Sequence, residues 1–454
     1  MNESILATKD IEALADWLLS QAKLRGVCGA ELQYSEGMGT SLSLKDGEIE
    51  ESTSGANAAL GLRVLLDGGR QGAASSDKLD KMSLLELLDA SLANAALCEP
   101  EDGVALYKGT QLFADPEILR EDPKIKEISQ AVRLENCKRL TELAQSDKRI
   151  ASVRLAGWQD GFGKSFYAST EGLAGWESSS SAGCELLVIA QKNGFTEMGG
   201  YGVDAHRLSE ISLEKTASRA VSDTILALGG RPVKTGNYTV VIEPECAVSL
   251  LEIIGELFCA TDIQKNRSMM KGMLGKKVAS SCFTLTDNGR LPWRSGTSCW
   301  DSEGHPTGET VLIENGVAKN YLYNLQSAYK DGVSSTGNCV RWLASLPEVG
   351  TSNLVLKGGS QTNAQLVACV KKGIYLTEFM GLHTIDPISG DFSVGAKGLL
   401  IENGEKTRAV SGITIASNLL DFMKNLAAVG SDVEFFGSVA ASALLVENIT
   451  VGGE

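Results

Sequence analysis

The chain has little histidine and lacks paired cysteines. Its only histidines are His206, His305 and His383. Dozens of residues separate them, so no H-x-x-x-H pair can hold zinc from one helix. Ten cysteines extend from Cys28 to Cys369 without a C-x-x-C pair. Scattered thiols in a chain of this size are typical of a reducing compartment. A metal site could therefore only be assembled from separate segments.

Basic surface and long apolar runs are also missing. The formal net charge is −15 and the lysines and arginines form no cluster, which argues against binding to a phosphate backbone. No stretch approaches the roughly 18 apolar residues that span a bilayer. The first residues, MNESILATKDIEALADWLL, carry acids where a signal peptide has basic residues. We expect a cytoplasmic protein with no membrane and no nucleic-acid partner.

The motifs of several enzyme classes are absent. No G-x-S-x-G sequence marks a serine hydrolase, and no G-x-x-x-x-G-K-[ST] loop is present to bind nucleotide phosphates. The sequence GFGKSF at 161–166 lacks the third glycine of a dinucleotide-binding loop. No cysteine has a neighbouring histidine that would activate its thiol. The sequence therefore shows no local motif of a serine hydrolase, a nucleotide-binding protein or a thiol enzyme.

The length and the helix signals that are present indicate two domains. A chain of 454 residues is too long for one ordinary core. An apolar stripe over residues 8–24 predicts an opening helix. A later helix over residues 208–228 precedes two glycines and Pro232, which are stop signals. We therefore predict a domain of residues 1–230 and a second of residues 231–454.

The two predicted domains are both of the α+β (mixed α/β) class. In the first, alternating strands and a hairpin tip at Asp67-Gly68-Gly69 predict an antiparallel sheet. Helical patterns at 84–92 and 125–140 predict helices that cover it. The second begins with the strand NYTVVIE and a helix from about 246 to 261, and then becomes glycine-rich and strand-like. We expect a strand-rich, barrel-like domain there.

Two similar sequences, VLIENGVAKN at 311–320 and LLIENGEKTR at 399–408, each end a predicted strand at Asn-Gly. Asn-Gly supplies the positive φ of a tight hairpin turn. The similarity is consistent with an internal repeat, but a shared turn type explains it more simply.

The segment from residue 381 to 404, GLHTIDPISGDFSVGAKGLLIENG, holds the best candidates for substrate contact. It places His383, Asp391 and Ser393 among glycines, directly before an apolar strand. Polar groups on a loop between rigid strands suit ligand binding, and Asp391 could orient the imidazole of His383. The alternative is that His383 only holds the loop together.

This segment resembles the C-terminal domain of the TldD/PmbA family, whose PmbA branch is also called TldE. The resemblance extends to DSEGHPTGETVLIENGVAKNYLYNLQSAYKDGVSSTGN at 301–338 and to GITIASNLLDFMKNLAAVGSD at 412–432. A weaker similarity, in LRVLLDGGRQGAASSD, concerns a strand pair near the N-terminus. The resemblance implies cytosolic proteins linked to peptide maturation, some of them described formerly as modulators of DNA gyrase.

The TldD branch of that family binds zinc through a helical H-E-x-x-x-H motif and a cysteine near the C-terminus. The matching positions here are Leu251, Glu252 and Glu256, and no cysteine follows Cys369. Only the glutamate, Glu252, remains, and it is a weak catalytic candidate because glutamates one turn apart usually form a solvated helix face. The resemblance therefore implies the PmbA (TldE) branch, with no metal in this chain and zinc in a TldD-type partner.

The sequence SSTGNCVR at 334–341 is the second segment with functional potential. Its small residues and Asn338 could present amide groups to a peptide main chain that adds a strand to a sheet edge. A buried turn between a helix and a strand is the alternative.

Together these features predict a subunit of a TldD/TldE-type metallopeptidase that acts on unfolded peptides. Its substrate-binding residues would be Asn338, His383, Asp391 and Ser393. One alternative is a self-sufficient hydrolase, with a homodimer completing a metal site from His383, Asp391 and distant acids such as Glu252. The other is a peptide-binding protein without peptidase activity. When its partner is absent, the chain could form a homodimer.

Overall fold

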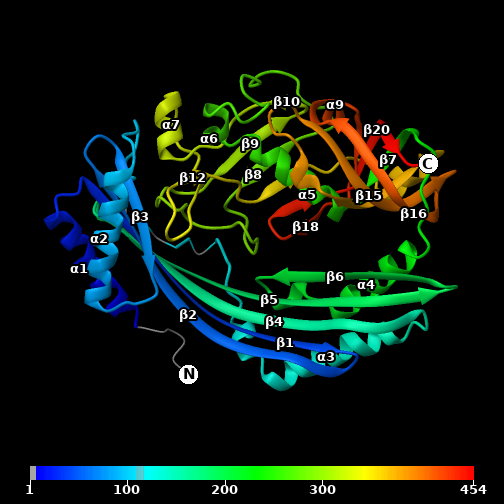
Figure 1. Cartoon of the computed structure of the whole chain (residues 1–454), viewed down its shortest axis with the longest axis horizontal. Helices are drawn as coiled ribbons and strands as arrows, with labels where there is room; N and C mark the ends of the chain where they lie inside the picture. Colours follow the sequence, from blue (N-terminus) through cyan, green and yellow to red (C-terminus); the bar gives the residue numbers. More distant parts are fainter. Residues whose placement is uncertain (1–6, 110–111, 113, 116) are drawn as a thin grey trace.

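Residues 7–109, 112, 114–115 and 117–454 are described by a computed structural model, which has a mixed α+β fold (Figure 1). Residues up to 227 form the lower and left parts of the molecule in this view, and residues from 236 form the upper part. We call these the N-terminal and C-terminal halves. The predicted fold class is confirmed, whereas the domain boundary at residue 230 stays a prediction.

The N-terminal half is built on one antiparallel sheet of long, curved strands. The strand order is β3-β2-β1-β4-β5-β6, and every neighbouring pair is antiparallel. The strands are β1 (Gly29–Lys45), β2 (Glu48–Leu66), β3 (Arg70–Ser76), β4 (Ile150–Ser169), β5 (Ala174–Lys192) and β6 (Phe195–Ala205).

Four helices cover one face of this sheet. On β1, Leu32 packs in a cluster with α1 and α2, and Leu42 packs in a second cluster with α3 and α4. Because side chains alternate along a strand, these even-numbered residues share one face, and the odd-numbered residues face the C-terminal half. The helical elements are α1 (Thr8–Leu24), α2 (Lys81–Leu97), η1 (Pro123–Glu127), α3 (Gln130–Gln145), η2 (Leu208–Glu210) and α4 (Leu213–Ala227).

The C-terminal half contains a closed five-stranded barrel, as the strand-rich sequence predicts. Its order is β16-β15-β14-β7-β20, and pairing of β16 with β20 closes it. The barrel strands are β7 (Gly236–Ile242), β14 (Lys372–Met380), β15 (Asp391–Glu402), β16 (Glu405–Asn418) and β20 (Leu444–Gly452), with β17 (Leu426–Val429) added to β20.

A second sheet and short helices complete this half. The sheet has the order β10-β9-β8-β13-β19-β18, and α5 packs between it and the barrel in the largest hydrophobic core. Its strands are β8 (Leu285–Asn288), β9 (Glu309–Glu314), β10 (Val317–Ala318), β13 (Leu354–Leu356), β18 (Glu434–Phe436) and β19 (Val439–Ala441). The other elements are the pair β11 (Cys339–Val340) and β12 (Glu348–Val349), and α5 (Pro244–Glu256), α6 (Ala260–Gln264), α7 (Leu325–Asp331), α8 (Asn363–Ala368), η3 (Leu382–Thr384) and α9 (Leu419–Lys424).

Several local predictions are confirmed, and others need a shifted boundary. The opening helix spans residues 8–24 as predicted, and both Asn-Gly pairs have positive φ. The helix predicted over 208–228 begins only at Leu213, because the Ser212 side chain caps it by accepting a hydrogen bond from the amide of Lys215. The helix predicted over 246–261 is two helices, α5 and α6.

A third predicted helix also starts later than its pattern indicates: Ile125 lies on η1, and α3 begins after the capping residue Ser129. Within the residues that the structure describes, no helix is long and apolar enough to cross a membrane.

Candidate functional site: the cleft between the two halves

The inner face of the N-terminal sheet forms a trough lined by small residues. Gly37 of β1 pairs with Gly163 of β4, which pairs with Ser179 of β5. One pleat further, Gly39 pairs with Gly161, which pairs with Ser181. A hollow of about 480 Å³ lies over these residues. Since no long side chain rises from them, the strand backbones form the floor of what we call the inner trough.

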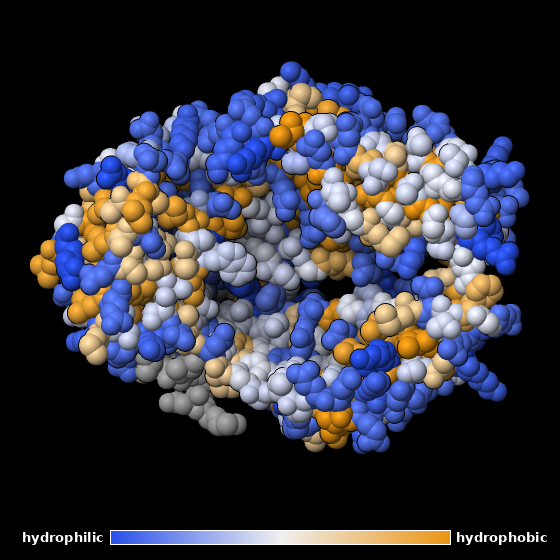
Figure 2. All heavy atoms as spheres, viewed as in Figure 1, coloured by the Kyte–Doolittle hydropathy of each residue, from blue (hydrophilic) through white to orange (hydrophobic). Residues whose placement is uncertain are grey.

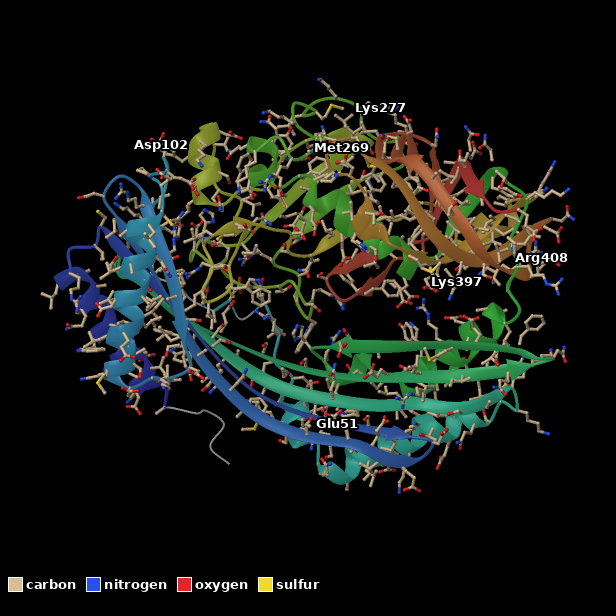
Figure 3. The ribbon with its side chains drawn as sticks, in the orientation of Figure 1. Glu51, Asp102, Met269, Lys277, Lys397 and Arg408 are labelled. Carbon is tan, nitrogen blue, oxygen red and sulfur yellow. The ribbon has the colours of Figure 1, made fainter. Side chains whose placement is uncertain are left out.

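The C-terminal half closes over this sheet, and Figure 2 shows a hollow between the two parts of the molecule. Gln33 of β1 donates a hydrogen bond from Nε2 to the carbonyl oxygen of Ser302 (3.1 Å). At the other side of the sheet, Lys397 of β15 places its Nζ 3.4 Å from Oε1 of Glu197 on β6. Lys397 lies on the side of the barrel that faces β6 (Figure 3). The hollow lies between these contacts (Figure 2).

A second cavity, of about 420 Å³, lies where β6 and α4 meet the barrel and α5. We call it the junction cavity. Arg219 of α4 pairs with two of the acids that line it: Nη2 is 2.8 Å from Oε2 of Glu245 and 3.3 Å from Oε1 of Glu243. The guanidinium also stacks on the rings of Tyr201 and Phe436. This one side chain therefore ties α4 of the N-terminal half to α5 and β18 of the C-terminal half.

Glu243 is the most perturbed acid of the junction cavity. Its side chain is only 18% exposed, and burial, reinforced by Asp223 and Glu245 and opposed by Arg219 and Lys406, raises its pKa to about 7. Burial also lowers the pKa of Lys406, whose Nζ lies 3.2 Å from the centroid of the Tyr375 ring. A carboxyl that titrates near neutral pH in a cavity is a candidate functional group.

Sequence reasoning missed Glu243, which directly precedes Pro244 at the start of α5. The signal was an acid before a helix-starting proline, a position where the helix dipole favours negative charge. Only the packed structure, however, reveals its burial.

The polar face of α5 continues from the junction cavity. Glu245 and Ser249 line the cavity, and Glu252 and Glu256 follow at spacings of three and four, which place them on the same face. Both are exposed. Desolvation by the surrounding protein raises the pKa of Glu252, and the Glu256 charge raises it further. Glu252 is thus positioned toward the polar side of α5, whereas Leu251 is fully buried in the core.

The family's zinc ligands find no equivalent in this geometry. Among the described residues, no group of three or more histidine, cysteine, aspartate or glutamate side chains could hold a metal ion. His206 and His305 each use Nδ1 in a hydrogen bond with a backbone carbonyl, of Ser180 (2.6 Å) and Pro306 (2.8 Å). A zinc ion therefore does not fit the residues described here.

The structure places Asn338 inside a hydrogen-bond network. Its Nδ2 donates to Oδ2 of Asp287 (2.7 Å) and to the carbonyl of Gly350 (3.2 Å), and its Oδ1 accepts from Oγ1 of Thr336 (2.7 Å). The residue is 5% exposed. These contacts favour the alternative of a buried turn, although Asn338 also lines a third cavity.

The loop after β14 holds the other predicted residues. His383 lies on η3 and is exposed, and among the described hydrogen bonds its ring has none. Asp391 accepts a hydrogen bond from Nδ2 of Asn418 (2.9 Å) and not from His383. Ser393 is exposed on β15. The loop is closed by Asp386, which accepts hydrogen bonds from the amide of Ile388 and the hydroxyl of Ser389.

The four predicted residues are therefore not one cluster. The structure brings Asp391 to Asn418 and Asn338 to Asp287, while His383 and Ser393 remain open to solvent. Sequence analysis missed the charged residues around the cavities, because they come from segments far apart in the chain.

Comparison with known proteins extends over almost the whole molecule. The family models of PmbA/TldA metallopeptidase domain 1, central domain and C-terminal domain match residues 30–95, 121–228 and 235–453. The metalloprotease PmbA of Escherichia coli O157:H7 is 27% identical over 430 residues, 94% of this chain and 92% of that one. A TldD homologue from Buchnera aphidicola is 26% identical, over 95% of each chain. Proteins named for the PmbA branch and for the TldD branch are thus both similar to this chain.

Solved structures agree with the sequence matches. A Thermotoga maritima protein, described as a proposed modulator of DNA gyrase, is 27% identical with a TM-score of 0.87, covering 97% of this chain and 100% of that one. TldE from Thermococcus kodakarensis, at 21% identity and a TM-score of 0.86, covers the same shares and supports the fold. With all three domain models matched in order along the sequence, the chain belongs to the PmbA/TldD metallopeptidase family.

Proposed function

We propose that this chain is the metal-free, PmbA (TldE)-type subunit of a cytoplasmic TldD/TldE-type metallopeptidase. The observation that carries the proposal is the position of Leu251. The residue that corresponds to the first histidine of H-E-x-x-x-H is a leucine with no exposed surface, packed in the main core. A metal there would require replacement of core packing as well as of a ligand.

The cleft supports a role in holding the peptide. An unfolded peptide presents backbone groups to any surface that has few side chains of its own, and the inner trough is such a surface. β6 lies at the edge of its sheet and lines the junction cavity through Glu197, Gly199 and Gly200. An extended peptide could add to that edge by main-chain hydrogen bonds. His383 and Ser393 remain proposed peptide contacts, whereas Asn338 and Asp391 would act by holding their loops.

The test is to co-express the chain with the metal-bearing homologue from the same genome and to purify the two proteins separately and together. Hydrolysis of an unfolded peptide and zinc content are measured for each sample. We expect hydrolysis only when both chains are present, with the zinc in the partner. The net charge of −15 predicts no binding to DNA in the same samples.

Three results would overturn this proposal. If the isolated chain cleaves peptides at a rate that survives Glu252→Ala and exhaustive chelation, it is catalytic without the partner. One tightly held metal per isolated chain would favour the self-sufficient homodimer instead. Retained peptide affinity without association with the homologue would identify a binding protein.

A further inference from the structure

The segment at the end of β11 has its charged side chain inside and its apolar side chains outside. The Arg341 side chain has no exposed surface, and its Nη2 lies 3.5 Å from Oε1 of Glu31, which is also buried. Val340 and Trp342, on either side of it, are 42% and 86% exposed. The hydrophobic effect favours the opposite arrangement. An exposed indole next to a buried guanidinium thus points to a ligand or partner that covers the apolar residues.

Contacts of the main chain hold Trp342 in place. Its amide donates a hydrogen bond to Oγ of Ser345 (2.9 Å), and its carbonyl oxygen accepts one from the amide of Ser345 (3.0 Å). The next residue, Leu343, packs its main chain on Gly61 of β2, where a Cβ would lie 2.2 Å from the Leu343 carbonyl oxygen. Only glycine leaves room for this approach. The loop is therefore fixed against the N-terminal sheet, while the indole of Trp342 is left uncovered.

Both exposed residues line the third cavity, of about 590 Å³. Ser35 of β1 and Ser165 of β4, which pair in the N-terminal sheet, line it as well. They lie one pleat from the pair Gly37 and Gly163 in the floor of the inner trough. Because residues two apart on a strand share one face of the sheet, the third cavity continues the inner trough. A chain that extends along β1 in the trough therefore reaches Trp342.

The size and the charges of this cavity indicate what can fill it. Pockets of about 300–1,000 Å³ hold small ligands, so the third cavity can take a few residues of an extended chain but not a folded domain. Arg120 pairs with Glu177 at its wall (3.6 Å). Asp301 and the Arg341 side chain are buried. An uncharged, apolar side chain suits such a wall better than a charged one, which would have to separate the pair.

We propose that Trp342 and Val340 bind a large apolar side chain of the peptide as it lies extended in the inner trough. An indole offers a wide, rigid surface to aromatic rings and aliphatic chains. The glycine and serine floor contacts the main chain of any sequence, so Trp342 would supply the selectivity. Large apolar side chains are exposed in unfolded chains and buried in folded ones. This inference rests on the proposed function and adds the class of side chain that is recognised.

The test measures binding of two uncharged hexapeptides to the full chain by calorimetry. Both are acetylated and amidated, and they differ only at one central residue, phenylalanine or alanine. The variants are Trp342→Ala and Trp342→Phe. The control is Leu97→Ala, which removes a side chain of similar exposure, 84%, from the end of α2. All variants should melt within a few degrees of wild type, because these side chains are exposed.

We expect the phenylalanine peptide to bind at least about tenfold more tightly than the alanine peptide, as burial of one aromatic side chain would produce. Trp342→Ala should reduce this preference to about twofold or less. Trp342→Phe should keep most of it, because an aromatic ring remains. Leu97→Ala should leave it unchanged.

Fluorescence reports the contact of Trp342 directly. The chain has six tryptophans, all within the described residues, and only Trp342 is exposed. Acrylamide should therefore quench its emission most strongly. We expect the phenylalanine peptide to protect the wild-type protein from this quenching. Trp342→Phe should show weaker quenching and no protection by the peptide.

Measurable but equal affinity for the two peptides would overturn this inference and leave the proposed function intact. A preference that survives Trp342→Ala, or that Leu97→Ala lowers equally, would also overturn it. If the metal-bearing homologue protects Trp342 from acrylamide without any peptide, the apolar residues form a subunit contact and the peptide assignment is wrong.

Two further outcomes separate the inference from the proposed function. Absence of binding by both peptides would overturn the inference, while peptide hydrolysis by the two chains together would still support the proposed function. A retained preference for phenylalanine in a chain that joins no TldD-type partner would support the inference and refute only the proposed function.

Discussion

Glu243, at the contact between the two halves, should make the stability of the folded protein depend on pH. It lies between the end of β7 and the start of α5, and its Oε1 is 3.3 Å from Nη2 of Arg219 in the other half. Its raised pKa of about 7 has burial as its main cause. The folded protein therefore holds a proton at Glu243 between pH 4.5 and 7 that the unfolded chain releases. Ionisation of this one group makes the folded state less stable as the pH rises through that range.

Glu243→Gln should remove this contribution. We expect the variant to match wild type near pH 5 and to be more stable by about 2 kcal/mol at pH 8. Urea unfolding of both proteins across this range measures the difference. A difference between the two proteins that does not change with pH would show that Glu243 ionises normally in the folded state.

Mutation of Asn338 should lower the stability of the protein, whereas mutation of His383 should not. Asn338→Ala removes a hydrogen bond from Asp287, which is 1% exposed and whose pKa burial already raises. We expect a loss of about 2 kcal/mol of unfolding free energy. His383→Ala is the matched control and should change stability by less than about 0.5 kcal/mol, as surface changes do. Unchanged stability of Asn338→Ala with lost peptide binding would restore its role as a substrate contact.

At the scale of elements, β1 has two faces with different tasks. Its even-numbered leucines bury against α1–α4, and its odd-numbered glycines and serines form the inner trough. A Cβ added at Gly39 would have its nearest neighbour, the carbonyl oxygen of Asp160, at 3.9 Å. There is thus room for a side chain at this point of the trough.

Gly39→Leu should fill the trough and lower peptide binding about tenfold or more without loss of stability. The matched control is Thr40→Leu, which puts the same side chain on the opposite face of β1, beside Ser54. The test measures the peptide affinity and the melting temperature of both variants and compares them with wild type. Equal effects of the two substitutions on affinity would show that the trough does not touch the peptide.

At the scale of the whole molecule, stability comes from apolar cores and from contacts between the halves. Arg219 and Lys397 connect the halves beside the junction cavity, and the fully buried Glu31–Arg63–Glu303–Arg341 group connects them elsewhere. None of these contacts involves a metal.

If the chain holds no metal, as we propose, exhaustive chelation should leave the melting temperature of the isolated chain unchanged within about a degree, because no metal-binding free energy would then contribute to folding. Differential scanning calorimetry before and after chelation, with elemental analysis, measures this. A clear fall in melting temperature that added zinc reverses would contradict it. The zinc-bearing homologue serves as the positive control.

The sequence by itself determined the features that depend on near neighbours. The apolar stripe of α1, the Asn-Gly turns at 315–316 and 403–404, and the replacement of the H-E-x-x-x-H histidines need only the local chain. Ordered family motifs also indicated the family. Boundaries such as the start of α4 were less predictable, since a capping serine competed with the helical pattern.

Only the tertiary structure decided which polar groups meet. Arg341 reaches Glu31 across 310 residues of chain, and Asp391 is bonded by Asn418 rather than by His383. The pKa of Glu243 is set by burial and by charges on α4, α5 and β16, and the inner trough exists only because β1, β4 and β5 align in register. Pairing and desolvation are properties of the packed neighbourhood, and a linear pattern does not contain them.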